Sequence, residues 1–199
     1  VVHDVELKTE RSSIDKGLEI HAVKNTIGSY SVLIRFNSIE NTSSLANPSL
    51  LVVNSFGNIL TLRPTDSEKN VSCGYRYYYI RGYQHRNLDS SFVYRLPFSE
   101  HKTSVRASTL YNINDRYFAK NSAHRNWASW KFKQEKNDTI YAMRKGIVVE
   151  IEDKHDPLNA DGVSFNTNYN SLTVEHADGT PCRYHVIEKP SMMVAAGVM

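Results

Sequence analysis

The sequence has little cysteine and no long apolar run, and each absence removes a class of protein or site. Its 199 residues contain two cysteines, Cys73 and Cys182, and neither belongs to a Cys-x-x-Cys motif. A redox motif of that kind is therefore excluded, and the two cysteines either form one disulfide or remain two buried free thiols. No stretch of about 18 consecutive apolar residues occurs, so we expect no membrane span.

An excess of charge of one sign is also lacking. The chain has 24 Lys and Arg against 21 Asp and Glu, a net charge of +3 spread along its length. Without a dense basic run, we expect no nucleic-acid partner. The Gly-x-Ser-x-Gly, phosphate-binding glycine loop, His-Glu-x-x-His and dinucleotide-binding patterns are absent as well. The start at Val1-Val2-His3, without Met, suits a mature secreted protein whose signal peptide has been removed, or a trimmed chain.

The residues that are abundant predict an all-β fold. Twelve tyrosines and seven phenylalanines, with many Val, Ile and Thr, favour strands over helices. Alternation in residues 29–36 predicts a strand with one apolar face, made of Tyr30, Val32, Ile34 and Phe36. Further strands are expected at residues 50–53, 59–62 and 75–82, the first covered on both faces and the second returning after a turn at 54–58. Residues 1–91 therefore predict a small β-sandwich-like module, with 83–91 as linker.

A second set of strands is expected in residues 92–199. It begins at residues 92–98 and includes a strand at 128–132. Residues 139–151 predict two strands joined by a turn at Lys145-Gly146. Residues 171–176 and 182–187 predict a hairpin around Asp178-Gly179.

Five short blocks of the second half occur in a familiar order. They are LPF at 96–98, DTIYA followed by KGIVV at 138–149, NSLTVEHADGT at 170–180, YHVI at 184–187 and VAAG at 194–197. In this order and spacing the blocks resemble the β-domain of the M23 (lysostaphin-like, LytM-like) zinc peptidases. The resemblance covers residues 92–199 and implies a degenerate M23-like domain that is incomplete at its C-terminus, since the family continues beyond the position of Met199.

The resemblance also implies where a catalytic zinc would bind. Its ligands in the family are a His, an Asp a few residues later, and the second His of a C-terminal His-x-His motif. His124 stands at the first position, but Lys131 stands at the second, and a cationic side chain cannot ligate Zn²⁺. The His-x-His motif does not occur, and Val186 takes the place of a usual histidine. We therefore expect no cofactor, with His124 as the one candidate metal ligand.

Other residues of the expected cleft are candidates for binding or proton transfer. His176 and His185 flank the predicted hairpin and are the candidate catalytic residues. The candidate ligand-binding residues are Trp127, Trp130, Lys131 and Tyr184, in which the aromatic rings suit sugars or peptides and Lys131 suits an acidic group. For each, an ordinary packing or solvated role is the alternative. Directly before and within the polar loop 154–170, the spacing of Asp153, His155, Asp156 and Asp161 fits neither a calcium loop nor a zinc helix.

Three functions remain open on this basis. The first is a non-catalytic relative of the M23 peptidases, secreted to the bacterial cell envelope or periplasm, which binds peptidoglycan or a protein partner. The second is a zinc endopeptidase that cleaves cell-wall peptides, seen as an incomplete or divergent chain, in which Glu135 or Asp138 replaces the missing Asp. The third is a protein in which the N-terminal module is the functional part and the second domain is only a scaffold.

Overall fold

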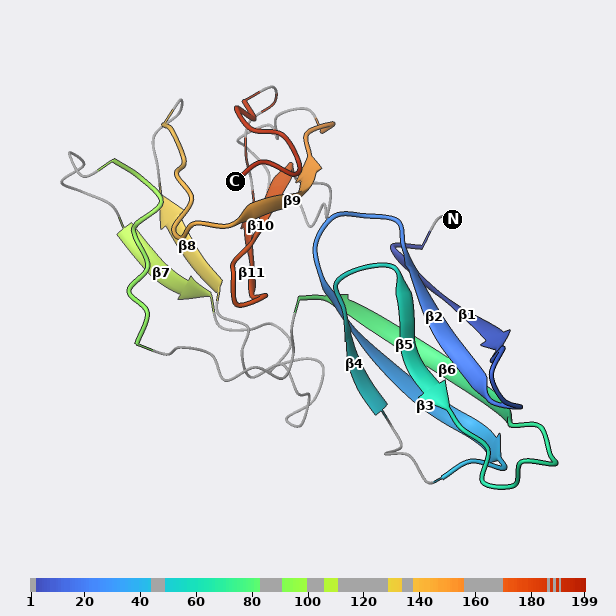
Figure 1. Ribbon diagram of the computed structural model, residues 1–199. Helices are drawn as coiled ribbons and strands as arrows, with labels where there is room; N and C mark the ends of the chain where they lie inside the picture. The colour runs from blue at the N-terminus through green and yellow to red at the C-terminus, as the bar shows by residue number, and fades with distance from the viewer. Residues whose placement is uncertain are drawn as a thin grey trace. The chain divides into compact units, whose positions relative to one another are not determined.

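The structure of the protein is a computed structural model that describes residues 3–43, 49–82, 91–99, 106–110, 129–133, 138–155, 170–185, 187, 189 and 191–199. In these residues all regular secondary structure is antiparallel β-sheet, which confirms the predicted all-β fold (Figure 1). No helix in the described ranges is long and apolar enough to cross a membrane. The chain forms two compact units, Val1–Ser91 with Lys145–Met199, and Phe92–Arg144. The division into domains 1–91 and 92–199 stays a prediction.

The first 82 residues form two three-stranded sheets. One sheet has the order β1 (Val5–Arg11), β2 (Leu18–Lys24), β5 (Gly57–Leu62), and the other has the order β4 (Ser49–Val53), β3 (Tyr30–Glu40), β6 (Ser72–Arg81). Their apolar faces share one core, as expected for a small sandwich. The four residues predicted to share one face of β3, namely Tyr30, Val32, Ile34 and Phe36, are all buried in that core.

Two details of this sandwich differ from the prediction. Strand β4 lies at the edge of its sheet, and Val52 in it is 41% exposed, so the apolar run 50–53 is not covered on both faces. Strand β5 does not return beside β4 but pairs with β2 in the opposite sheet. The turn at 54–56 therefore carries the chain from one sheet to the other, which a local turn signal does not reveal.

The same compact unit contains a third sheet near the end of the chain. Its order is β11 (Pro181–His185), β10 (Ser171–Glu175), β9 (Ile147–Glu152). The β10–β11 pair confirms the predicted hairpin. The outer edge of β9 is also paired, because Val148 N donates to Val198 O at 3.0 Å and Gly197 N donates to Val148 O at 2.8 Å. The C-terminal segment therefore covers that edge of the sheet.

The unit Phe92–Arg144 contains the two-stranded ladder of β7 (Arg106–Leu110) and β8 (Ser129–Lys133). The strands predicted at residues 92–98 and at 139–144 are wrong, since neither segment forms a strand. The two segments are instead joined by single hydrogen bonds, from Arg95 N to Met143 O at 2.9 Å and from Tyr141 N to Pro97 O at 3.0 Å. Pro97 has no N–H to donate, which limits a continuous ladder there.

Candidate functional site

The sheet β9–β10–β11 has one polar and one apolar face, and its polar face is the candidate site. The register places Glu150, Thr173 and Arg183 in one row across the three strands. A second row holds Glu152, Ser171 and His185. Because side chains alternate along a strand, both rows lie on the same face.

Arg183 connects the members of these rows. Its Nη2 lies 3.7 Å from Glu150 Oε2 and 3.9 Å from Glu152 Oε2. Its Nε and Nη2 also donate to Ser171 Oγ at 3.3 and 3.1 Å. Thr173 Oγ1 donates to Glu150 Oε2 at 3.0 Å. The face therefore presents one guanidinium between two carboxylates.

The two hydroxyl residues of the central strand are buried beneath these charges. Ser171 is 1% exposed and Thr173 is 2% exposed, whereas the side chain of Arg183 is 45% exposed. A buried hydroxyl is costly unless it is hydrogen-bonded, and both hydroxyls have a partner here. The hydroxyl groups of Ser171 and Thr173 therefore lie buried in the sheet, whereas the guanidinium of Arg183 is partly exposed to solvent.

Hydrogen bonds and burial shift the pKa values of the two titratable groups of the second row, Glu152 and His185. Hydrogen bonds from Lys154 Nζ at 2.9 Å and His155 Nε2 at 3.2 Å hold the pKa of Glu152 below its ordinary value. Partial burial lowers the pKa of His185, nearby Arg183 lowers it further, and Glu150 partly opposes both. At neutral pH the second row therefore combines the ionised carboxylate of Glu152 with the neutral imidazole of His185.

Two buried polar residues hold the ends of strand β10. At its start, Asn170 Nδ2 donates to His155 O at 2.8 Å and to Ile187 O at 3.2 Å, and Asn170 Oδ1 accepts from His155 N at 2.8 Å. At its end, His176 N donates to Thr180 O at 2.9 Å, closing the turn that Gly179 makes at φ +80°. These contacts fix the strand that carries both hydroxyls.

The candidate residues predicted on this sheet have different surroundings. His185 belongs to the polar face and is exposed. Tyr184 points to the opposite face and is 9% exposed. His176 is 3% exposed, and its Nδ1 donates to Lys145 O at 3.1 Å. Burial favours a packing role for Tyr184 and a turn-holding role for His176, which leaves His185 as the candidate that solvent reaches.

The other candidates fall in the second compact unit or outside the described residues. Trp130 in β8 is 56% exposed. Lys131 stands opposite Ser108 in the β7–β8 register. His124, Trp127 and Val186 lie outside the described residues.

In the part of the chain that the structure describes, no set of donors fits a hydrolytic zinc site. Such a site needs three protein ligands around one open position. Among the described residues, no group of three His, Cys, Asp or Glu side chains could hold a metal ion. At the position that the resemblance assigns to a carboxylate, β8 carries Lys131.

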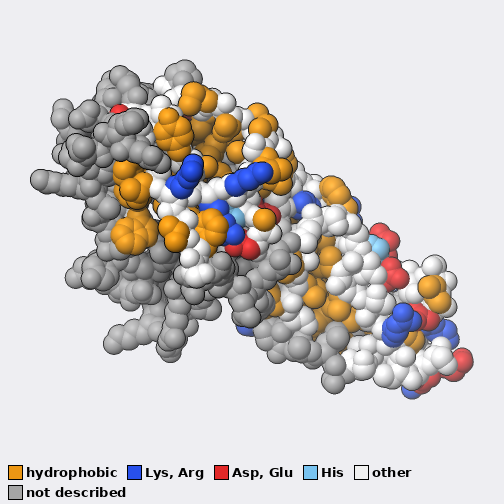
Figure 2. Space-filling model, turned by 60° about the vertical axis from the view of Figure 1, so that its left-hand side comes forward, with side chains coloured by type: hydrophobic (Ala, Val, Ile, Leu, Met, Phe, Trp, Pro, Cys, Tyr) orange, Lys and Arg blue, Asp and Glu red, His pale blue; other side chains and the backbone are white. Residues whose placement is uncertain are grey.

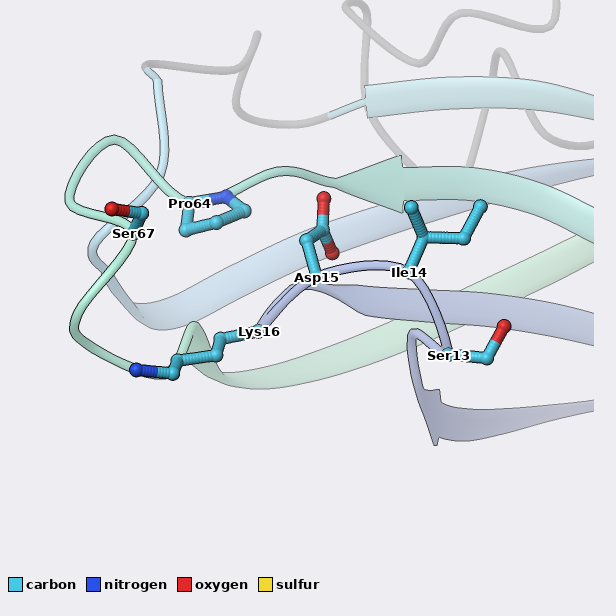
Figure 3. A pocket seen from close by; sticks show the side chains of 6 residues that line it. All are labelled: Ser13, Ile14, Asp15, Lys16, Pro64 and Ser67. Atoms are coloured by element: carbon cyan, nitrogen blue, oxygen red, sulfur yellow. The ribbon is translucent and has the colours of Figure 1, made fainter.

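Three further features lie away from this sheet's polar face. The two cysteines are free thiols, one in β6 and one in β11. In the sandwich, the loops after β1 and β5 enclose an open pocket of about 420 Å³ (Figure 3). It is lined by Ser13, Ile14, Asp15, Lys16, Pro64 and Ser67. Asp15 there accepts a hydrogen bond from Gly17 N at 2.8 Å, so its carboxylate stabilises the loop.

Sequence reasoning missed Glu150, Thr173 and Arg183 as site residues. The signal was present, because polar residues alternate with apolar ones in all three strands. What the alternation does not reveal is register, and register alone brings these three side chains into one row.

Comparison of the chain with protein-family models, with curated proteins and with solved structures finds no match.

Proposed function

We propose that the protein is a non-catalytic, M23-like protein of the bacterial cell envelope that binds peptidoglycan or an envelope protein. The observation that carries the proposal is the polar face of β9–β11, where Arg183 lies between Glu150 and Glu152 over two buried hydroxyls. A face with both signs of charge is complementary to peptides that carry carboxylate and amino groups together, as cell-wall peptides do.

The arrangement of the motif blocks also supports the proposal. The blocks at 145–149, 170–180 and 184–187 contribute β9, β10 and β11, and the VAAG block at 194–197 leads to the segment paired with β9. Blocks that are separated in the sequence by up to about twenty residues thus become neighbours in one sheet.

The chemistry of the donors favours binding over zinc-dependent hydrolysis. Lys131 would repel a metal ion at the position where the family has a carboxylate that binds zinc. Its ammonium group can instead bind an acidic group of a peptide or sugar. His185 has its pKa lowered, so a neutral imidazole would offer hydrogen bonds to a peptide at neutral pH.

Co-sedimentation with purified peptidoglycan sacculi tests the proposal. We expect the wild-type chain to sediment with sacculi and the Arg183→Gln variant to bind about tenfold more weakly, since a charge-assisted contact is lost. Arg63→Gln is the matched control, because Arg63 is an exposed arginine that follows strand β5 of the sandwich. Equal binding by both variants would contradict a role for the polar face.

Elemental analysis of protein purified without chelator separates this proposal from the zinc endopeptidase. Zinc well below one ion per chain is expected. One zinc per chain, together with cleavage of wall peptides that a chelator abolishes, would overturn the non-catalytic function and direct attention to ligands around His124.

A further inference from the structure

The sheet β4–β3–β6 buries one face in the sandwich core, so its alternate residues form an outer face. In one row of this face, Leu33 of β3 lies between Leu50 and Tyr78. In the next row, Val52 and Ile80 lie across β3 from each other. Tyr78 is 58% exposed, and Val52 and Ile80 are exposed as well. Figure 2 shows one face of the molecule, where hydrophobic side chains reach the surface beside Lys and Arg.

The third row of the outer face holds two arginines. Arg35 of β3 is paired directly with Arg76 of β6, which lies two residues from Tyr78 on the same face. Both arginines are exposed. Within the described residues neither guanidinium forms an ion pair, whereas Arg63 and Lys69 of the same sandwich pair with carboxylates. Like charges directly opposite each other on a ladder repel, so an acidic group bound between the two arginines would stabilise the pair.

Strand β6, which carries three of these side chains, is also an edge of its sheet. In the described ranges its only ladder is with β3, and it is 10 residues long and contains no proline. A long edge of this kind presents unpaired backbone N–H and C=O groups, to which another strand can add. An added strand would place its own side chains beside Arg76, Tyr78 and Ile80, because side chains of neighbouring strands share a face.

We propose that the edge of β6 binds an extended segment of a partner protein, whose side chains on one face are apolar at one end and acidic at the other. The acidic side chains of this segment pair with Arg35 and Arg76. Its apolar side chains pack against Tyr78 and Ile80. Main-chain hydrogen bonds supply affinity, and the order of apolar and acidic positions supplies specificity.

The open edge favours a protein strand over other partners. Lipid tails packed against Tyr78 and Ile80 would leave the nearby backbone groups of β6 without hydrogen bonds, whereas a strand pairs with them. The flat face of a sheet is also unsuited to a small ligand, which needs a concave pocket. A second copy of this chain is disfavoured, because pairing of two β6 strands would bring a further Arg76 to the face and no carboxylate.

The inference goes beyond the proposed function and does not rest on it. The surface at β6 belongs to the sandwich, whereas the proposed function depends on the polar face of β9–β11. The two sites are tested with different probes, a peptide for β6 and purified sacculi for the polar face, so that either proposal can fail alone.

Fluorescence anisotropy with a labelled peptide tests the inference on the full chain. The probe has about ten residues, with two valines and then two glutamates at every second position and threonines between them. In an antiparallel strand, the valines then lie beside the apolar rows and the glutamates beside the arginines. We expect a dissociation constant below about 100 μM. The Arg35→Gln/Arg76→Gln variant should bind at least about tenfold more weakly.

A matched control and altered probes separate the parts of the site. Arg63→Gln/Lys69→Gln removes the same charge from exposed positions of the sandwich and should bind within about twofold of wild type. On the wild-type chain, where no folding defect can enter, a probe with glutamines in place of glutamates should bind at least about tenfold more weakly. N-methylation of alternate amides along one edge of the probe should weaken binding at least about tenfold, and along its other edge no more than about twofold.

Each other outcome overturns the inference. Absence of peptide binding, or equal weakening by both double variants, would show that the arginine pair is no specific site. Equal binding of the two N-methylated probes would show that no strand adds to β6. Binding to phosphatidylglycerol vesicles without peptide binding would make a membrane the ligand. A dimer in sedimentation that the peptide dissociates would make a second copy of the chain the occupant.

Discussion

At the scale of single residues, Asn170 shows how a buried amide organises the chain around the candidate site. Its three hydrogen bonds join His155, where the loop leaves β9, to Ile187, which follows β11. All of its partners are backbone groups. The side-chain amide therefore makes hydrogen bonds to backbone groups that a neighbouring strand would otherwise make at the end of the sheet.

We predict that Asn170→Ala lowers the free energy of unfolding by about 3 kcal/mol, since it leaves buried backbone groups without partners. The midpoint of urea unfolding measures the change. Asn58→Ala, at an exposed position of β5, is the control and should change it by no more than about 0.5 kcal/mol. Equal effects of the two substitutions would show that the amide of Asn170 does not hold the sheet.

A second residue-scale prediction concerns Gly146, which lies directly before β9. A Cβ there would be 2.3 Å from Glu175 O and 2.7 Å from Val174 Cγ1. Gly146→Ala must therefore separate β9 from β10, and we expect a loss of about 2 kcal/mol in thermal or urea unfolding. At Gly74 the added Cβ would meet only the Ser38 hydroxyl, at 3.0 Å. Gly74→Ala should accordingly cost less than half as much, and the opposite ranking would refute the steric account.

At the scale of elements, one carboxylate joins the sandwich to the sheet of the candidate site. Glu175, the last residue of β10, accepts hydrogen bonds from Ser29 N and Ser29 Oγ, both at 2.8 Å. Ser29 directly precedes β3 and is buried. The Glu175 carboxylate thus connects the start of β3 in the sandwich to the end of β10 in the β9–β11 sheet.

We predict that Glu175→Ala lowers the free energy of unfolding by about 2 kcal/mol, because both bonds to a charged acceptor are lost. Hydrogen exchange gives a sharper measure, since the Ser29 amide should exchange faster while the amides of β6 stay protected. Glu68→Ala removes a carboxylate that is 87% exposed and serves as control. An unchanged exchange rate of the Ser29 amide in Glu175→Ala would contradict a stabilising role for the Glu175–Ser29 hydrogen bonds.

At the scale of the whole molecule, the free energy of unfolding should depend on pH through titratable groups in the sandwich and in the β9–β11 sheet. On the acid side, His185 has a pKa below its ordinary 6.5 and Glu152 a pKa below its ordinary 4.5. As pH falls, the unfolded chain protonates each group first, so stability falls below pH 6.5 and again below pH 4.5.

On the alkaline side the relevant groups are two thiols, whose pKa values are raised rather than lowered. Burial raises the pKa of Cys73 and Cys182 above the ordinary 9.0, with a hydrogen bond from Tyr184 partly opposing it at Cys182. The unfolded thiols then ionise first as pH rises, so their contribution is lost above pH 9.

Melting temperatures measured by circular dichroism from pH 4 to 10 should therefore pass through a maximum between about 7 and 8. His185→Asn should remove the decline that begins near pH 6.5 and keep the one that begins near 4.5. His21→Asn, at a half-buried histidine of β2, is the matched control. A decline that persists in the His185 variant would assign the acid step to another group.

The class of fold and several strands follow from the amino-acid sequence alone. Alternation identified the buried face of β3, and the Asp178-Gly179 turn identified the β10–β11 hairpin, because both signals depend on neighbours in the chain. The sequence pattern misassigned residues 92–98, where strand-forming residues have only single hydrogen bonds to another segment. Local propensity cannot tell whether a partner strand will be present.

Which strands pair, and which side chains come into contact, follow from the three-dimensional structure and not from the sequence pattern. The crossing of β5 to the second sheet and the row of Glu150, Thr173 and Arg183 both depend on register between distant segments. Register is set by which apolar faces can be buried together, and that is a property of the packed sheets rather than of any one segment.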